Sequence, residues 1–279
     1  MSIKDRLPIL EADGLHTPSV GEWAYKKYLR VWMYDQIVSR GMKNKWGERV
    51  YVDLFAGAGR ALLRDSGRTV PSSALLALEV NDPFDRYIFC EADPVRMQAL
   101  QQRVRAAAPG ADVHFVAGDS NAVVDQVIPL VPERSLTFCF VDPYGVNIKL
   151  ETIRRLSAGR NMDFLILLAL QMDANRNRAL YSSEASSKLD DFLGNTAWRK
   201  DWEEASRKGG DFRRFLADQY VRAMTRIGYS ATSIEDMYEM RTESNLSIYY
   251  LAFFSKNERG YHFWREALKY SDEQTNLFG

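Results

Sequence analysis

Residues 50–59 read VYVDLFAGAG, an apolar run that ends in an aspartate and two closely spaced glycines. The β-branched and aromatic residues at its start favour a strand. Gly57 and Gly59 would let the backbone approach a ligand closely, because glycine has no Cβ. We therefore expect the segment from Asp53 to Gly59 to follow a strand and to open a helix at the start of a nucleoside-binding α/β unit.

Four further runs of the same kind follow along the chain, and each is apolar on both faces, as a parallel strand covered by helices should be. They are YIFCE (87–91), VHFVAGD (113–119), LTFCFVD (136–142) and DFLILLAL (163–170). Helical candidates lie between them, notably at 94–108 and 120–128. The alternation predicts an α/β fold, a doubly wound, Rossmann-like sheet.

The segments around this core complete the predicted organisation. An amphipathic helix is expected over 22–40 and ended by Gly41, and an inserted loop over 60–86. SIYYLAFFS (247–255) is predicted to be a strand that pairs antiparallel at the sheet edge, and 261–270 is predicted to be a closing helix. We divide a single domain, 1–279, into an N-terminal helical segment (1–48), a cofactor-binding core (49–170), a helical insertion (171–226) and closing strands with a C-terminal helix (227–279).

Composition excludes several classes of protein. The 279 residues carry no net charge, which argues against a polybasic nucleic-acid coat but leaves room for a local basic groove. Two cysteines and three scattered histidines predict neither a disulfide framework nor a zinc cluster, so no metal is expected. The longest apolar run is too short for a membrane span, and MSIKDRLPIL (1–10) lacks the apolar core of a signal peptide. We expect a cytoplasmic protein.

The glycine segment departs from the dinucleotide pattern G-x-G-x-x-G, because Leu62 stands at the third glycine position. This counts against a pyrophosphate and hence against an NAD-dependent oxidoreductase. A carboxylate at the strand end instead suits a cationic ligand such as S-adenosylmethionine, which carries a sulfonium and an amino group. The predicted cofactor-binding residues here are Asp53, Phe55, Gly57 and Gly59; a simple tight turn is the alternative.

Two more strand ends carry acids. Glu91 ends YIFCE, where a carboxylate can accept both hydroxyls of a ribose. Its separation from Asp53 exceeds the usual ~20 residues, and the predicted loop 60–86 would supply the excess. Alternatively, Glu91 is a surface acid before a helix capped by Asp93. Asp119, followed by Ser120, can bind the adenine amino group, cap the next helix, or do both.

The fourth strand end carries the predicted acceptor site, Asp142-Pro143-Tyr144. Asp142 and a neighbouring backbone carbonyl can accept the two N–H bonds of an amine conjugated into a base ring, and Tyr144 can stack on that ring. A common D-P-x-G turn is the alternative. Arg176 and Arg178 follow the fifth strand and are predicted to bind an anionic substrate, or else to be solvated. Polar sites at successive carboxyl ends would converge on one crevice.

With these residues in view, the sequence resembles the three-Cys-motif partner family, TcmP. The matching stretches are YVDLFAGAGR (51–60), FCEADPVRMQAL (89–100), FVDPYG (140–145), MDANRN (172–177) and YLAFFSKNERGYHFW (250–264). The resemblance implies a class I methyltransferase-like fold and a bacterial or phage-linked setting. It also implies a companion protein with three cysteines that itself looks like a radical S-adenosylmethionine protein.

A more distant likeness links the chain to nucleic-acid amino-methyltransferases, which carry D-P-P-Y where this sequence has Asp142-Pro143-Tyr144. The missing proline changes the backbone carbonyl geometry at the target amine. Our leading hypothesis is an S-adenosylmethionine-dependent methyltransferase with a nucleobase amine of RNA or DNA as candidate acceptor. The rival hypothesis is a non-catalytic subunit of the same fold that binds the three-Cys companion.

Overall fold

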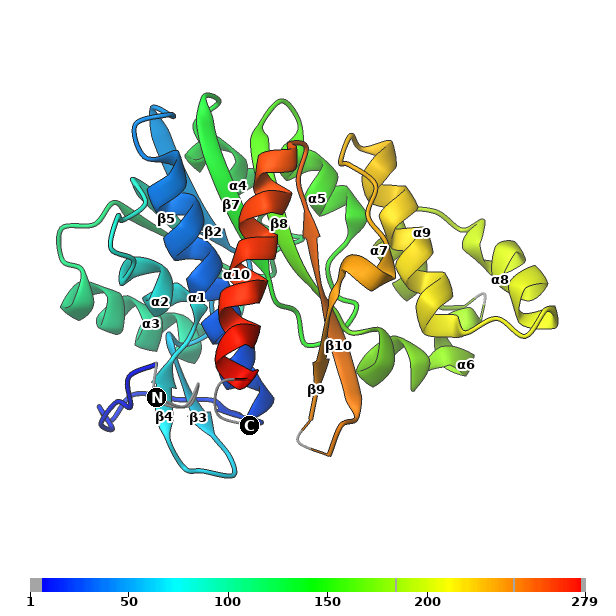
Figure 1. Ribbon diagram of the computed structural model, residues 1–279, viewed down its shortest axis with the longest axis horizontal. Coiled ribbons are helices and arrows are strands. Elements are labelled where there is room, and N and C mark those ends of the chain that lie inside the picture. The colour runs from blue at the N-terminus through cyan, green and yellow to red at the C-terminus, as the bar shows by residue number, and fades with distance from the viewer. Residues whose placement is uncertain (1–6, 184, 243, 277–279) are drawn as a thin grey trace.

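The fold is built on a seven-stranded sheet in the order β6-β5-β2-β7-β8-β10-β9 (Figure 1). A computed structural model describes residues 7–183, 185–242 and 244–276. The strands of this sheet are β2 (Glu48–Asp53), β5 (Arg86–Glu91), β6 (Val113–Ala117), β7 (Ser135–Val141), β8 (Asn161–Leu168), β9 (Tyr238–Arg241) and β10 (Ser247–Phe254). β2, β5, β6, β7 and β8 are parallel, while β10 pairs antiparallel with both β8 and β9. This is the predicted Rossmann-like sheet, and the antiparallel pairing of β10 is as expected. The expected place of that strand at the sheet edge is wrong, because β9 pairs along its outer side and forms the edge.

Helices cover both faces of the sheet because successive side chains of each strand point to opposite sides. On β2, Val50 and Val52 pack into one apolar cluster and Tyr51 into the other. The Tyr51 face is covered by α1 (Trp23–Met42), α2 (Ser73–Leu78), α3 (Pro94–Ala107) and α10 (Glu258–Asn276). The opposite face is covered by α4 (Val124–Val127), α5 (Leu150–Ser157), α7 (Lys188–Leu193) and α9 (Phe212–Arg226). The doubly wound prediction is confirmed.

The expectation that the glycine segment opens a helix is wrong. Residues after Gly59 form a hairpin of β3 (Arg60–Leu63) and β4 (Thr69–Pro71), which β1 (Ser19–Val20) extends by parallel pairing with β3. The alternation of burial along β3 explains this, since Ala61 and Leu63 are buried in a small cluster with α1 while their neighbours are partly exposed. Helix α2 begins only at Ser73. Residues 60–86 are therefore not a loop, and the hairpin lies beside the N-terminal segment (Figure 1).

Three predicted helix boundaries also differ. The helix expected over 120–128 is reduced to α4, followed by a 3-10 turn at Ile128–Leu130, because Pro129 has no N–H to continue an α-helix. Gly41 lies inside α1 rather than ending it, and a Cβ there would come within 2.8 Å of Phe263 on α10. α10 itself is longer than the predicted 261–270.

Residues 171–226 are helical, as predicted. They contain most of a π-helical turn, η3 (Leu170–Asn175), together with α6 (Arg178–Ser182), α7, α8 (Trp198–Arg207) and α9. Four aromatic residues of this segment pack together: Trp198 and Phe212 are buried, and the Trp202 ring lies 4.7 Å from Phe212 and 5.2 Å from Phe215. The insertion thus has its own apolar contacts beside the sheet.

Cys90 and Cys139 are buried free thiols whose pKa is raised by burial. Within residues 7–183, 185–242 and 244–276, no cluster of three or more His, Cys, Asp or Glu could hold a metal ion. No helix in the described part of the chain is long and apolar enough to cross a membrane. Residues 1–6, which begin the stretch compared with a signal peptide, lie outside the described residues.

Asp35 on α1 is fully buried, and neither of its carboxylate oxygens has a hydrogen-bond partner among the described residues. Burial raises its pKa well above the ordinary 3.8, and the nearby Asp53 carboxylate adds to the rise. The folded state therefore holds a proton that the unfolded state releases above about pH 4. The stabilising contribution of this proton is present below pH 3.8 and is lost as the pH rises toward the folded pKa.

Asp35→Asn is expected to remove this pH dependence, because asparagine resembles the protonated acid. The variant and the wild type should unfold in urea with similar free energies near pH 4. As the pH rises further, the free energy of unfolding of the variant should increase relative to that of the wild type, by at most about 1.4 kcal/mol per pH unit. Parallel curves from acidic to neutral pH would contradict a raised Asp35 pKa.

Candidate functional site

A cavity of about 530 Å³ lies at the carboxyl ends of the parallel strands. It brings together eight of the predicted site residues from the ends of β2, β5, β6 and β7. They are Phe55, Gly57, Glu91, Asp119, Ser120, Asp142, Pro143 and Tyr144. Parallel strands end at the same edge of a sheet, so polar residues far apart in the sequence meet there.

Glu91 connects the first two strand ends. Its Oε2 accepts a hydrogen bond from the Gly57 backbone N–H at 2.9 Å, and its Oε1 accepts one from the Asp93 N–H at 2.8 Å. Gly57 has φ +64°, and a Cβ built on it would meet nothing within 4 Å. Because Gly57 lines the cavity, that side chain would occupy space a ligand could use. Asp93 also caps α3, accepting from Val95 and Arg96, as its alternative role predicted.

The third strand end holds its loop by side-chain hydrogen bonds. Asp119 Oδ1 accepts from the backbone N–H groups of Asn121 at 3.0 Å and Ala122 at 3.3 Å. The buried Ser120 hydroxyl donates to the Leu54 carbonyl oxygen, which ties this loop to the end of β2. Asp119 therefore stabilises the turn before α4 while lining the cavity. It does not cap the next helix, which its alternative role predicted, because α4 begins only after Val123, which makes no side-chain cap.

Asp53 and Gly59 do not line the cavity in the part of the chain that the structure describes. Asp53 is fully buried; it accepts from the Ser73 hydroxyl at 2.7 Å and from the Phe55 N–H at 3.0 Å. Burial raises its pKa to about 7, although these two hydrogen bonds act in the opposite direction. Gly59, with φ +82°, packs against Leu75 and Leu100. Asp53 and Gly59 therefore stabilise the glycine loop through buried contacts with the protein.

The fourth strand end contains Asp142, whose Oδ2 forms an ion pair with the Lys27 ammonium of α1. Pro143 is buried, whereas Tyr144 is 76% exposed at the edge of the cavity. Arg96 donates to the Tyr144 hydroxyl at 3.0 Å, and its guanidinium lies 5.4 Å from the ring centroid. Tyr144 is thus an accessible aromatic surface beside a cation.

Arg176 and Arg178 are exposed and do not line the described cavity. Their neighbours in the MDANRN stretch have other positions: Met172 lines the cavity, and Asp173 Oδ2 accepts from the Val146 N–H at 2.8 Å. Asp173 thereby holds the turn that follows Tyr144. Arg176 and Arg178 follow Asp173 along the chain, and their contact with an anionic substrate stays a prediction.

Several residues that line the cavity were not predicted from the sequence. Trp23, Lys27 and Tyr28 come from α1, and Tyr249 comes from β10. The apolar spacing of α1 predicts only a buried helix face, and tyrosine and tryptophan suit such a face as well as they suit a binding site. A lysine within that face was the available signal, since a buried lysine requires a partner.

The N-terminal segment also contributes to the wall, through Pro18, Ser19, Val20 and Gly21. Arg103 of α3, which is nearly fully buried, fastens this segment. It donates to both oxygens of Asp13 at 2.8 Å, to the His16 carbonyl at 3.0 Å and to the Ala58 carbonyl of the glycine loop at 2.6 Å. One side chain thus joins the segment to the glycine loop.

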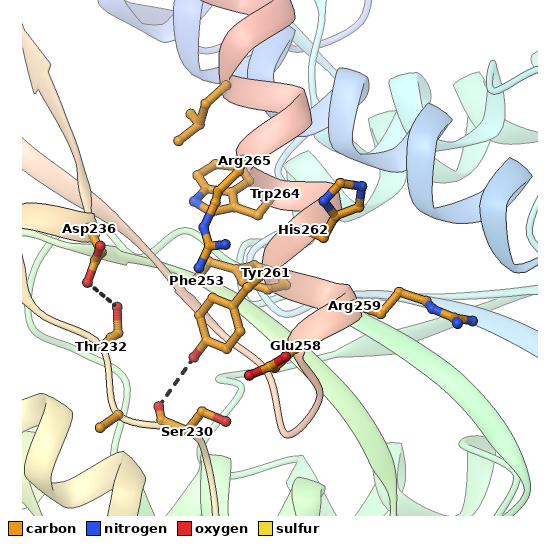
Figure 2. A pocket seen from close by; sticks show the side chains of 12 residues that line it. Ser230, Thr232, Asp236, Phe253, Glu258, Arg259, Tyr261, His262, Trp264 and Arg265 are labelled. Atoms are coloured by element: carbon orange, nitrogen blue, oxygen red, sulfur yellow. Dashed lines mark hydrogen bonds between the residues drawn. The ribbon is translucent and has the colours of Figure 1, made fainter.

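A second, larger cavity of about 630 Å³ lies between α10 and the segment 230–236 (Figure 2). Tyr261 donates to the Ser230 carbonyl at 3.3 Å across it, and Arg265 and His262 lie on its α10 side. No residue that the sequence analysis assigned to a site lines it within the described chain. The cavity at the strand ends is therefore the candidate active site, although it is the smaller.

Comparison with family models finds no match, and comparison with curated proteins finds none either. Among solved structures, the chain is similar to an O-methyltransferase from Bacillus cereus in complex with SAH, with 11% identity and a TM-score of 0.45 over 83% of this chain and 80% of that one. It is also similar to TYW2 from P. horikoshii in complex with MeSAdo, with 13% identity and a TM-score of 0.44 over 91% of this chain and 73% of that one. The fold class rests on strand order and direction.

Proposed function

We propose that this chain is an S-adenosylmethionine-dependent methyltransferase whose acceptor is a nucleobase amine of RNA or DNA. The observation that supports it most is the convergence of the glycine loop, Glu91, Asp119 and Asp142 on one cavity at the carboxyl ends of a methyltransferase-type sheet. Each lies at the end of a different strand, in the order expected for a nucleoside cofactor followed by its acceptor.

The residues present fit the cofactor. Glu91 lines the cavity with a carboxylate whose position is held by two backbone N–H groups, so it is pre-arranged to accept ribose hydroxyls. Gly57 leaves open space in front of the loop, and Asp119 can accept from an adenine amino group. When bound, S-adenosylmethionine supplies a methyl group on a positively charged sulfur, which keeps the bonding electron pair as the acceptor nitrogen takes the methyl.

The residues of the fourth strand end would orient the acceptor. Asp142 would accept an N–H bond of the amine, which localises the nitrogen lone pair toward the methyl group. Tyr144 offers a stacking face at the cavity edge, and the proton released by the methylated nitrogen can pass to water there. Catalysis of this kind depends on positioning rather than on a covalent enzyme intermediate.

Glu91→Ala is expected to weaken binding of S-adenosylhomocysteine roughly ten- to a hundredfold in calorimetry, the effect of losing a hydrogen bond to a charged group. Glu91→Gln keeps the side-chain shape and one acceptor oxygen, so it should lose less affinity than Glu91→Ala. NAD should bind neither variant nor the wild type. Unchanged affinity in Glu91→Ala, with an unchanged melting temperature, would contradict the assignment of Glu91 to the ribose.

Transfer itself is tested with radiolabelled S-adenosylmethionine and total RNA and DNA, with Glu91→Ala as the inactive control. The resemblance to the three-Cys-motif partner family supports adding the three-Cys companion to one arm of the assay. Label in nucleic acid would support the proposal. Tight cofactor binding without transfer to any acceptor in either arm would favour the rival proposal, a cofactor-binding subunit that serves the companion.

A further inference from the structure

The ion pair of Lys27 and Asp142 lies in the wall of the candidate active site. Both residues line the cavity, and their side chains are 5% and 16% exposed. The Lys27 ammonium also lies 5.3 Å from the Trp23 ring centroid and 4.7 Å from that of Tyr28. Two aromatic faces therefore hold this cation where it meets the predicted acceptor residue.

The pair leaves hydrogen-bonding capacity unused. Of the two carboxylate oxygens of Asp142, only Oδ2 has a hydrogen-bond partner among the described residues. The Lys27 ammonium uses one of its three N–H donors in that bond. Tyr249 stands beside them, 3% exposed, with a hydroxyl that has no partner in the described chain. Burial and the Asp142 carboxylate raise the pKa of Tyr249, so the hydroxyl keeps its proton.

A purely structural role explains this cluster poorly. A buried ion pair contributes little net stability, because desolvation offsets the attraction between the charges. Buried polar groups are normally satisfied, so the unpartnered Tyr249 hydroxyl, beside the unpaired oxygen of Asp142 in the same cavity wall, indicates that a ligand completes them. That ligand must offer both donors and acceptors, since a carboxylate oxygen and an ammonium lie side by side.

We infer that Lys27 determines acceptor specificity: with Asp142 it recognises the edge of a neutral nucleobase that presents an amine N–H beside a ring nitrogen. The inference rests on the proposed function and names the substrate class of that site. Asp142 Oδ1 would accept from the exocyclic amine, and Lys27 would donate to the adjacent ring nitrogen. Adenine and cytosine both present such an edge.

The charge of the pair explains why the acceptor should be neutral. An unpaired Asp142 would attract any cationic amine, including the ammonium group of a protein lysine. Lys27 cancels that charge and places a positive group where a second ammonium would have to lie. Trp23, Tyr28 and Tyr249 contribute flat apolar surface, which suits a planar ring better than a flexible alkyl amine.

Binding of labelled oligonucleotides by fluorescence anisotropy tests the inference. The probes are short single strands of oligoadenylate, oligocytidylate and an abasic strand of equal length, each with and without saturating S-adenosylhomocysteine, plus a lysine-rich peptide. The wild type should bind an adenine or cytosine strand roughly five- to a hundredfold more tightly than the abasic strand, the range of one bidentate base contact.

In Lys27→Met the affinity for the base-containing strands should fall close to the affinity for the abasic strand. Lys27→Arg should keep part of the preference for bases. Lys26 is an exposed neighbour on α1, and Lys26→Met should leave the affinity for every strand unchanged. The salt dependence should be the same in Lys27→Met and in the wild type, because Lys27 is placed to contact a base. A slope lowered by about 0.7 would instead indicate a phosphate contact and overturn the inference.

Other outcomes would also overturn it: no preference for bases over the abasic strand in the wild type, a preference unchanged in Lys27→Met, or tighter binding of the lysine-rich peptide. Calorimetry with S-adenosylhomocysteine controls for the fold, since Lys27→Met should bind it as the wild type does. A wild type that reads bases but never binds S-adenosylhomocysteine would contradict the proposed function and leave the base-reading role of Lys27 standing.

Discussion

Gly57→Val is expected to abolish measurable binding of S-adenosylhomocysteine, a loss of roughly a hundredfold or more. Gly57 donates its backbone N–H to Glu91 and lines the cavity. The valine side chain would project into the open space of that cavity. It would also have to adopt φ +64°, which costs a β-branched residue about 1–2 kcal/mol. Calorimetry measures the first effect and urea unfolding the second.

Gly67→Val is the matched control for this strain. Gly67 lies in the turn between β3 and β4, with φ +67°, and a Cβ placed on it would meet no atom within 4 Å. Unlike Gly57, it does not line the described cavity. The control should lose stability as Gly57→Val does and keep its affinity for S-adenosylhomocysteine. If both variants lose affinity in proportion to their loss of stability, Gly57 is only a turn residue.

Arg103→Met is expected to destabilise the protein by on the order of 3 kcal/mol, because a nearly buried guanidinium with charged and backbone partners is lost. The segment 7–22 should become susceptible to limited proteolysis, since Arg103 joins it to Ala58 of the glycine loop. Arg105→Met on the same helix is exposed and should leave stability and proteolysis unchanged. Equal behaviour of the two variants would contradict the role of Arg103.

The same contact predicts a pH dependence. The hydrogen bonds from Arg103 lower the pKa of Asp13 to about 2. A carboxyl whose folded pKa is lowered stabilises the fold above its unfolded value, here 3.8, and that contribution is lost as the pH falls through about 2. Arg103→Met should lose this acid sensitivity. Its free energy of unfolding should therefore improve, relative to that of the wild type, as the pH falls from 3.8 to about 2.

The sequence by itself determined the sheet and the positions of the polar strand ends. Runs such as YIFCE and LTFCFVD are short and apolar on both faces, a pattern that depends on neighbouring residues and survives any tertiary arrangement. Because parallel strands end at a common edge, the convergence of Glu91, Asp119 and Asp142 followed from their places along the chain. That much is local periodicity combined with a topological rule.

Only the tertiary structure decided what lies opposite these residues. Lys27 meets Asp142 from 115 positions away in the sequence, and Tyr249 joins them from the last strand. The hairpin after Gly59 was equally hidden, because its two inward residues are buried only where β1 and α1 pack on them. Periodicity reports which face of an element is buried, whereas the partner on that face is chosen by long-range packing, which no spacing within the element encodes.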